Sequence, residues 1–338
     1  MEIILFLPIL LSLMITLLVV PKWIRKCRQI ELLWPDMNKY GYPKKVASSG
    51  GIVIILAFVL GVLSYVALET FALDGNNTLN VKIFSFLNVV ILAGLIGLVD
   101  DFLGWQKGGL SWRFRILMAF IISIPLVVIN VGDHIMSIPF FGQVNFGIFY
   151  SLLIIPLGVA GTTTTFNFLA GFNGLEAGQG IIIIGFLSFI AYITGNSWLA
   201  IMGLIMVASL IGFYFYNRFP ARVFPGNGAT WAVGSMIACM AILGNFEKIA
   251  VFIFIPYIIE TFLKAGRGKL KKQSFGIPDK KNSLSLPYKK IYGLTHFSIF
   301  VLSKFKKEVK EQDVIYFIWI FQILICFLGL IIFRTSLF

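Results

Sequence analysis

The chain has 338 residues, of which 58% are hydrophobic and only 13% are charged, with a formal net charge of +13. This composition is too apolar for a soluble domain of this length, in which about half of the residues would be apolar. The basic residues are scattered among the connections between long apolar runs, which disfavours a nucleic-acid-binding protein, and three widely separated cysteines predict neither a disulfide framework nor a zinc site.

Ten apolar stretches predict an all-α polytopic membrane protein with about ten transmembrane helices, organised as one integral-membrane domain over residues 1–338. The first stretch lacks a basic leading region and a small-residue cleavage site, so it is predicted to be a span and not a removed signal peptide. In chain order the stretches are 2–21, 49–70, 83–99, 114–131, 147–165, 179–194, 198–216, 229–244, 248–264 and 313–333.

Lysine and arginine gather in alternate connections between these stretches. The odd-numbered connections hold most of them, and the ninth is a long basic loop, 265–311, whereas the even-numbered connections hold few. The positive-inside rule therefore predicts that the odd connections face the cytoplasm and that both termini lie outside.

Polar clusters fall on the same predicted side. Asp100 and Asp101 follow an uncharged run from 83 to 99. One charge at the middle of a membrane helix costs about 2.5–3.5 kcal/mol, so we expect the pair at the cytoplasmic end of the third span, opening the second connection. Further clusters lie at 36–45, 167–176 and 217–230. A transporter would place its polar groups near mid-membrane, so clustering on one face indicates a site open to cytosolic substrate and lipid headgroups.

These clusters contain the groups that phosphoryl transfer needs. Magnesium prefers oxygen ligands, commonly one or two carboxylates with phosphates and water. The oxygen-bearing candidates are Asp100, Asp101, Asn167, Asn173, Glu176 and Asn227, and the cationic candidates are Lys44, Lys45, Arg115 and Arg222. His296, in the basic loop, is a further candidate for contacting substrate.

Each cluster also has a purely structural interpretation. The acid pair could be a solvated helix end, the lysines could be topology signals alone, and the Asn-Gly dipeptides at 173 and 227 are common in turns.

The same residues resemble motifs of a known family. Val99-Asp100-Asp101-Phe102, the stretch 167–179, the stretch 216–224 and the first-loop segment 36–39 are similar to motifs of the polyprenyl-phosphate N-acetylhexosamine-1-phosphate transferases, the glycosyltransferase 4 type. Within that family the chain resembles the branch of archaea and eukaryotes that uses UDP-N-acetylglucosamine (UDP-GlcNAc) and dolichyl phosphate. The resemblance covers about residues 30–230.

The resemblance implies a ten-span enzyme that depends on Mg²⁺, with Mn²⁺ as a substitute. Such an enzyme transfers N-acetylglucosamine-1-phosphate from UDP-GlcNAc to a polyprenyl (dolichyl) phosphate and releases UMP. This is the first membrane step of N-glycan or cell-surface glycan assembly. An archaeal cell membrane, or the endoplasmic reticulum membrane of a eukaryote, is the expected location, with a cytoplasmic active site, and a homodimer is left open.

The resemblance also implies roles for individual residues. Asp100, Asp101 and Arg115 are expected to be catalytic, Arg115 matching a lysine that holds the diphosphate. Asp101, Asn167 and Asn227 are expected at the metal. The expected substrate-binding residues are Asn38, Lys44, Lys45, Asn173, Glu176, Arg222, Arg267 and His296.

Three departures from the family pattern stand out. Asn227 replaces an aspartate that is a metal ligand in the family, so this position offers a carbonyl oxygen but no charge. Thr164 stands where the family often has asparagine. The histidine- and arginine-rich motif of the last cytosolic loop is not evident, and Arg267 and Lys269 are candidates for its phosphate contacts.

The expected mechanism is attack of a lipid phosphate oxygen on the β-phosphorus of UDP-GlcNAc. The second pKa of a phosphate monoester is about 6, so the nucleophile is ionised at neutral pH and catalysis rests on positioning and charge neutralisation, with Asp100 orienting or deprotonating the lipid phosphate. A covalent aspartyl intermediate is the alternative route. One alternative function is a lipid-phosphate transporter or flippase. A second is a catalytically weak lipid-phosphate-binding homologue, which Asn227 suggests because the family has an aspartate at this position.

Overall fold

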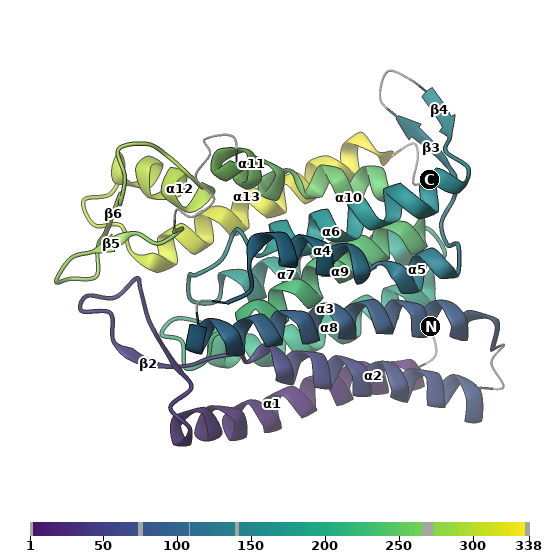
Figure 1. Cartoon of the computed structure of the whole chain (residues 1–338), viewed down its shortest axis with the longest axis horizontal. Helices are drawn as coiled ribbons and strands as arrows, with labels where there is room; N and C mark the ends of the chain where they lie inside the picture. The colour runs from purple at the N-terminus through teal and green to yellow at the C-terminus, as the bar shows by residue number, and fades with distance from the viewer. Residues whose placement is uncertain (1–2, 74–76, 108, 139–141, 266–272, 335–338) are drawn as a thin grey trace.

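The computed structural model describes residues 3–73, 77–107, 109–138, 142–265 and 273–334. Figure 1 shows a bundle of helices that run roughly along one direction, with short two-stranded hairpins at its ends. Among the described residues, seven helices are long and apolar enough to cross a membrane. They are α1 (Leu7–Gln29, preceded by the short helix η1, Ile3–Phe6), α2 (Gly51–Phe71), α3 (Asn80–Lys107, preceded by η2, Asn77–Leu79), α7 (Leu175–Ile193), α8 (Ser197–Asn217), α9 (Gly226–Gly244) and α13 (Glu311–Ile332). A helical polytopic membrane protein is therefore confirmed.

The three other predicted spans are each built from two successive helical pieces. They are α4 (Trp112–Ile121) with α5 (Ile124–Val128), the π-helical η3 (Tyr150–Ile154) with α6 (Ile155–Phe166), and α10 (Glu247–Ile253) with α11 (Ile255–Ala265). In each case the second piece has proline as its second residue, at 125, 156 and 256. Proline lacks the amide hydrogen and its ring clashes with the preceding turn, so a helix tends to end before it and restart at it. The figure of ten spans stays a prediction.

The central helix of the bundle is α9. Its residues from Gly228 to Gly244 are buried, and it packs closely on α3. A β-carbon added at Gly97 of α3 would lie 2.4 Å from the carbonyl oxygen of Asn227, and one added at Gly228 would lie 2.8 Å from Leu98. Small residues let two helix backbones approach in a membrane bundle, and here they bring the N-terminus of α9 against α3 just before Asp100.

The polar connections lie at one end of the bundle, which we call the loop end. It carries the hairpin β1 (Leu33–Pro35) with β2 (Lys44–Ala47), the hairpin β5 (Ile277–Pro278) with β6 (Leu284–Ser285), and α12 (Leu294–Ser303). The hairpin β3 (Ile135–Ile138) with β4 (Gly142–Asn145) lies at the opposite end, where α1 starts and α13 ends (Figure 1). The described part of the predicted basic loop 265–311 is thus structured, and which side of the membrane the loop end faces stays a prediction.

Candidate active site

The acidic pair lies inside a helix and not at its end. Helix α3 continues through Asp100 and Asp101 to Lys107, and Asp100 is only 1% exposed. The helix therefore continues past the predicted span 83–99, because apolar length locates a hydrophobic run but cannot detect a helix that continues beyond it. That the pair lies at the cytoplasmic end of the span stays a prediction.

Asp100 is held by three donors. Its Oδ1 accepts hydrogen bonds from the guanidinium of Arg115 at 3.0 Å and from the backbone N–H of Leu110 at 2.7 Å. Its Oδ2 accepts one from the side-chain amide of Asn227 at 2.7 Å. A buried carboxylate is stable only when it is paired and hydrogen-bonded, and Arg115 supplies the compensating charge.

Asp101 faces the start of α9. The backbone N–H of Asn227 donates to its Oδ1 at 2.7 Å, and that of Gly228 donates to its Oδ2 at 3.3 Å. The first amides of a helix have no partner within the helix and form its positive end, so α9 binds the Asp101 carboxylate as it would bind an anion. Gly226 has a φ of +71°, and a β-carbon there would lie 2.2 Å from Asp101 Oδ2, so this turn requires glycine.

The two asparagines predicted at the metal converge on the same helix start. Asn167 is the residue that ends α6, and its Oδ1 accepts a hydrogen bond from the Thr230 hydroxyl at 3.0 Å. Thr230 lies one turn after Asn227 on α9. Thr164 bonds back to its own helix, at the carbonyl of Ala160, and does not take part. Helices α3, α6 and α9 thus bring together residues from three stretches that lie far apart in the sequence.

The oxygens at this point suit a hard divalent cation. They belong to two carboxylates and two carboxamides, the ligand type that magnesium prefers, and one or two carboxylates are its usual share of protein ligands. Among the described residues, however, no group of three or more acidic, histidine or cysteine side chains is placed to hold a metal ion. A divalent ion held by these groups would need water and phosphate for the rest of its coordination.

A second polar cluster surrounds Asn173 and was only partly predicted. The Asn173 backbone N–H donates to Glu311 at 2.7 Å, and its side-chain amide donates to Asp36 at 3.1 Å. Lys39 pairs with both carboxylates. Neither Glu311 nor Lys39 was predicted as a site residue. Glu311 is the first residue of α13, and no motif in the sequence around it marks it as part of a site.

The predicted residues Asn38 and Glu176 join this cluster through the loop after α6. Asn38 donates to the carbonyl of Gly171 at 2.9 Å and accepts from the N–H of Gly276 at 3.2 Å. Glu176 accepts from the N–H of Gly171 at 2.8 Å. Among the described residues, two buried acceptor atoms here have no partner, Asn173 Oδ1 and Glu176 Oε2.

Lys264 was not predicted, and it holds two parts of the loop end together. Lys264 is only 6% exposed, and its ammonium group donates to the carbonyl of Phe168 at 2.5 Å and to the Ser274 hydroxyl at 2.8 Å and pairs with Glu260 at 3.0 Å. Glu260 in turn accepts from the N–H of Leu294 at 2.5 Å. The i,i+4 spacing could have revealed the Glu260–Lys264 pair, but not its tertiary partners.

The other predicted substrate-binding residues take different positions. His296 is buried in α12 with its ring against Tyr288, and this burial lowers the pKa of its imidazole to about 4. Lys45 is exposed on β2. Arg267 (with Lys269) and the side chain of Lys44 lie outside the described part of the structure.

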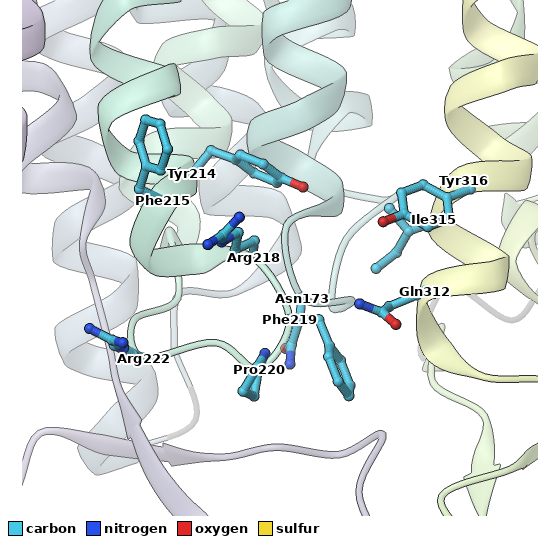
Figure 2. A pocket seen from close by; sticks show the side chains of 10 residues that line it. All are labelled: Asn173, Tyr214, Phe215, Arg218, Phe219, Pro220, Arg222, Gln312, Ile315 and Tyr316. Atoms are coloured by element: carbon cyan, nitrogen blue, oxygen red, sulfur yellow. The ribbon is translucent and has the colours of Figure 1, made fainter.

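Arg222 lines a pocket of about 280 Å³ between the end of α8 and the start of α13. Figure 2 shows Arg218 and Arg222 on the α8 side of this pocket and Gln312 and Tyr316 on α13 opposite, with Asn173 between them. The pocket therefore borders the Asn173 cluster, and Arg218 was not predicted to belong to it.

Comparison with known proteins identifies the family. Residues 83–245 match the model of glycosyl transferase family 4. The chain is 32% identical over 333 residues, 98% of its own length and 97% of the relative's, to a protein of Saccharolobus solfataricus provisionally named UDP-N-acetylglucosamine–dolichyl-phosphate N-acetylglucosaminephosphotransferase.

Two further relatives carry the same activity in their names. A protein of Sulfolobus acidocaldarius, also provisionally named, is 34% identical over 94% of this chain and 93% of its own length. The Dictyostelium discoideum enzyme of that name is 27% identical over 68% of this chain and 64% of its own. This chain belongs to the glycosyl transferase 4 family of polyprenyl-phosphate N-acetylhexosamine-1-phosphate transferases.

Proposed function

We propose that this protein transfers N-acetylglucosamine-1-phosphate from UDP-GlcNAc to a polyprenyl (dolichyl) phosphate, giving lipid-diphosphate-GlcNAc and UMP. The near-full-length relatives named for this activity support the proposal. The observation that carries it is the anchoring of the acidic pair to Arg115 and to the positive start of α9. Such a site can place positive groups beside the negative charge of phosphate. Neutralising that charge is the main requirement of phosphoryl transfer.

Each group in the proposed reaction has its own role. The lipid phosphate is ionised at neutral pH and needs no strong base. Arg115, with 34% of its side chain exposed, neutralises charge on the diphosphate. The burial of Asp100 favours a role in positioning Arg115 and Asn227 over direct contact with the lipid phosphate. Mg²⁺, when bound, would stabilise charge on the transferred phosphoryl group, and Asp101 with the side-chain oxygens of Asn167 and Asn227 would hold it.

The Asn173 cluster is proposed to bind the sugar nucleotide. A buried acceptor without a donor costs about 1–3 kcal/mol, so Asn173 Oδ1 and Glu176 Oε2 fit a ligand that brings N–H or O–H donors, such as the base and sugars of UDP-GlcNAc. Asn38 and Lys45 lie in the same first loop and are proposed to complete this site, and Lys44 and Arg267 remain predictions. His296, buried and neutral, is proposed to support the segment around it.

We also propose that the loop end faces the cytoplasm, with ten spans and both termini outside, in an archaeal cell membrane. The basic connections at that end support this orientation.

One assay tests the proposed function. Purified protein receives Mg²⁺, polyprenyl phosphate and labelled UDP-GlcNAc, and lipid-linked product and UMP are measured, with Asp101→Asn as the negative control. Product and UMP in equal amounts are expected. No product with any UDP-sugar would refute the enzyme. Activity that appears only in Asn227→Asp would instead identify the wild type as a catalytically weak lipid-phosphate-binding homologue.

A further inference from the structure

The pocket between α8 and α13 has a cationic wall. Arg218 and Arg222 are both exposed there. Within the described ranges neither guanidinium has an ion-pair partner, whereas that of Arg115 pairs with Asp100. Two unpaired guanidinium groups beside one cavity favour a phosphate, because the planar donor arrangement of arginine matches phosphate oxygens.

The opposite wall adds neutral donors. Gln312 and Tyr316 of α13 line it, and Tyr214 of α8 lies between the two sides (Figure 2). Since an amide group and phenol hydroxyls can donate to phosphate or headgroup oxygens without adding charge, a singly charged phosphate diester suits this pocket.

The position of the pocket indicates what presents the phosphate. Helix α8 ends at Asn217 and α13 begins at Glu311, and both helices are long and apolar enough to cross a membrane. The pocket therefore lies where two membrane helices meet their polar connections. Phe215, 53% exposed, and Ile315 give it an apolar side. Basic pockets between membrane helices are sites for anionic lipid headgroups.

We propose that this pocket binds the phosphate headgroup of an anionic membrane lipid that is not the lipid substrate. This site is separate from the acidic pair, whose cation Arg115 comes from α4, and the proposal does not depend on the proposed function. Asn173 borders both the pocket and the proposed nucleotide site, so competition with the nucleotide is the decisive comparison.

Native mass spectrometry of the detergent-solubilised protein tests the site. Wild type, Arg218→Gln and the double variant Arg25→Gln/Arg28→Gln are titrated with phosphatidylglycerol, with phosphatidylcholine and with inorganic phosphate. Arg25 and Arg28 are exposed arginines at the loop end of α1 that do not line the pocket, so their double variant is the charge control. A melting curve in neutral detergent checks that each variant is folded.

We expect one tightly bound phosphatidylglycerol per wild-type chain and per control chain. Arg218→Gln should lose at least tenfold in affinity for it, and Arg218→Lys should retain part. Saturating UDP-GlcNAc should leave the bound lipid in place. Equal loss in the control, equal binding of phosphatidylcholine, equally tight binding of inorganic phosphate, or displacement by UDP-GlcNAc would each overturn the proposal. The transferase assay is measured separately. A negative result for lipid binding therefore leaves the proposed function standing, and a negative transferase result leaves the proposed lipid site standing.

Discussion

The side-chain amide of Asn227 donates a hydrogen bond of 2.7 Å to Asp100, while the backbone N–H of the same residue donates to Asp101. One residue thus binds both members of the acidic pair. An aspartate here, as in the family pattern, would replace a donor by a third negative charge, and only a bound cation would compensate it.

Asn227→Asp should therefore make stability depend on magnesium. Without the ion the variant should lose about 1.5–3 kcal/mol, because a hydrogen bond to a charged group is lost and a like charge is added. With millimolar Mg²⁺ its melting temperature should rise more than that of wild type. Thermal unfolding with and without Mg²⁺ checks this, and Asn145→Asp, at the opposite end of the bundle, is the control. An identical magnesium response in wild type and Asn227→Asp would contradict the metal assignment.

Arg115→Gln should lower activity more than stability. It removes the cation beside Asp100, and because Arg115 is partly exposed we expect a stability loss of about 1–3 kcal/mol. The transferase rate should fall by about 10²-fold or more, since one preorganised donor to a developing negative charge contributes this much in other enzymes. Arg115→Lys should recover part of the rate. Arg113→Gln, which removes an exposed arginine of the same helix, should leave the rate within twofold, and a matching fall there would point to helix damage instead.

Gly226→Ala tests the turn that presents α9 to Asp101. The positive φ alone costs about 1–2 kcal/mol in a residue with a side chain, and the added methyl group also clashes with the carboxylate. Gly147→Ala is the matched control, because Gly147 has a φ of +51° but open space around it. Both variants should lose stability in chemical denaturation, and only Gly226→Ala should lose product formation. Full activity in Gly226→Ala would argue against a role for this Asp101 geometry.

Lys264→Met should destabilise the loop end strongly. It leaves Glu260 buried without its cation, a change that costs about 3–5 kcal/mol. The double variant Lys264→Met/Glu260→Gln should recover much of this loss. Lys281→Met, which breaks the exposed pair with Glu308, should leave the free energy of unfolding nearly unchanged, because solvent screens an exposed ion pair. Protection of the 273–294 segment from hydrogen exchange is the measurement, and unchanged protection in Lys264→Met would refute this role.

The buried His296 should make stability fall in mild acid. Its pKa is about 4 in the folded protein against an ordinary value of 6.5, so below pH 6.5 the unfolded chain binds a proton that the folded chain does not. The free energy that neutral His296 contributes to folding is fully present above pH 6.5. It decreases as the pH falls toward 4, by up to about 3 kcal/mol, because each unit of difference in pKa corresponds to about 1.36 kcal/mol. Unfolding free energies of wild type and His296→Phe between pH 4 and 7.5 should diverge in this way. Parallel curves would show that His296 is not the responsible group.

The sequence alone determined the class of the protein and the location of its polar chemistry. Runs of apolar residues are sufficient to predict helices in a membrane, because a spanning segment must satisfy its own backbone hydrogen bonds. The acid pair and the asparagines at 167, 173 and 227 were predicted as one site, and the structure brings the pair, Asn167 and Asn227 to the start of α9.

Only the tertiary structure decided how these groups are held. The contacts of Asp100 and Asp101 with the start of α9 exist only because α3 and α9 pack together. The partners Glu311 and Lys264 come from helices more than 90 residues away from the loop that they bind. A hydrogen bond between distant parts of a chain leaves no periodicity or spacing in the sequence, because its geometry exists only once the helices have packed. For that reason the chemistry could be predicted residue by residue, and the partners that hold it in place could not.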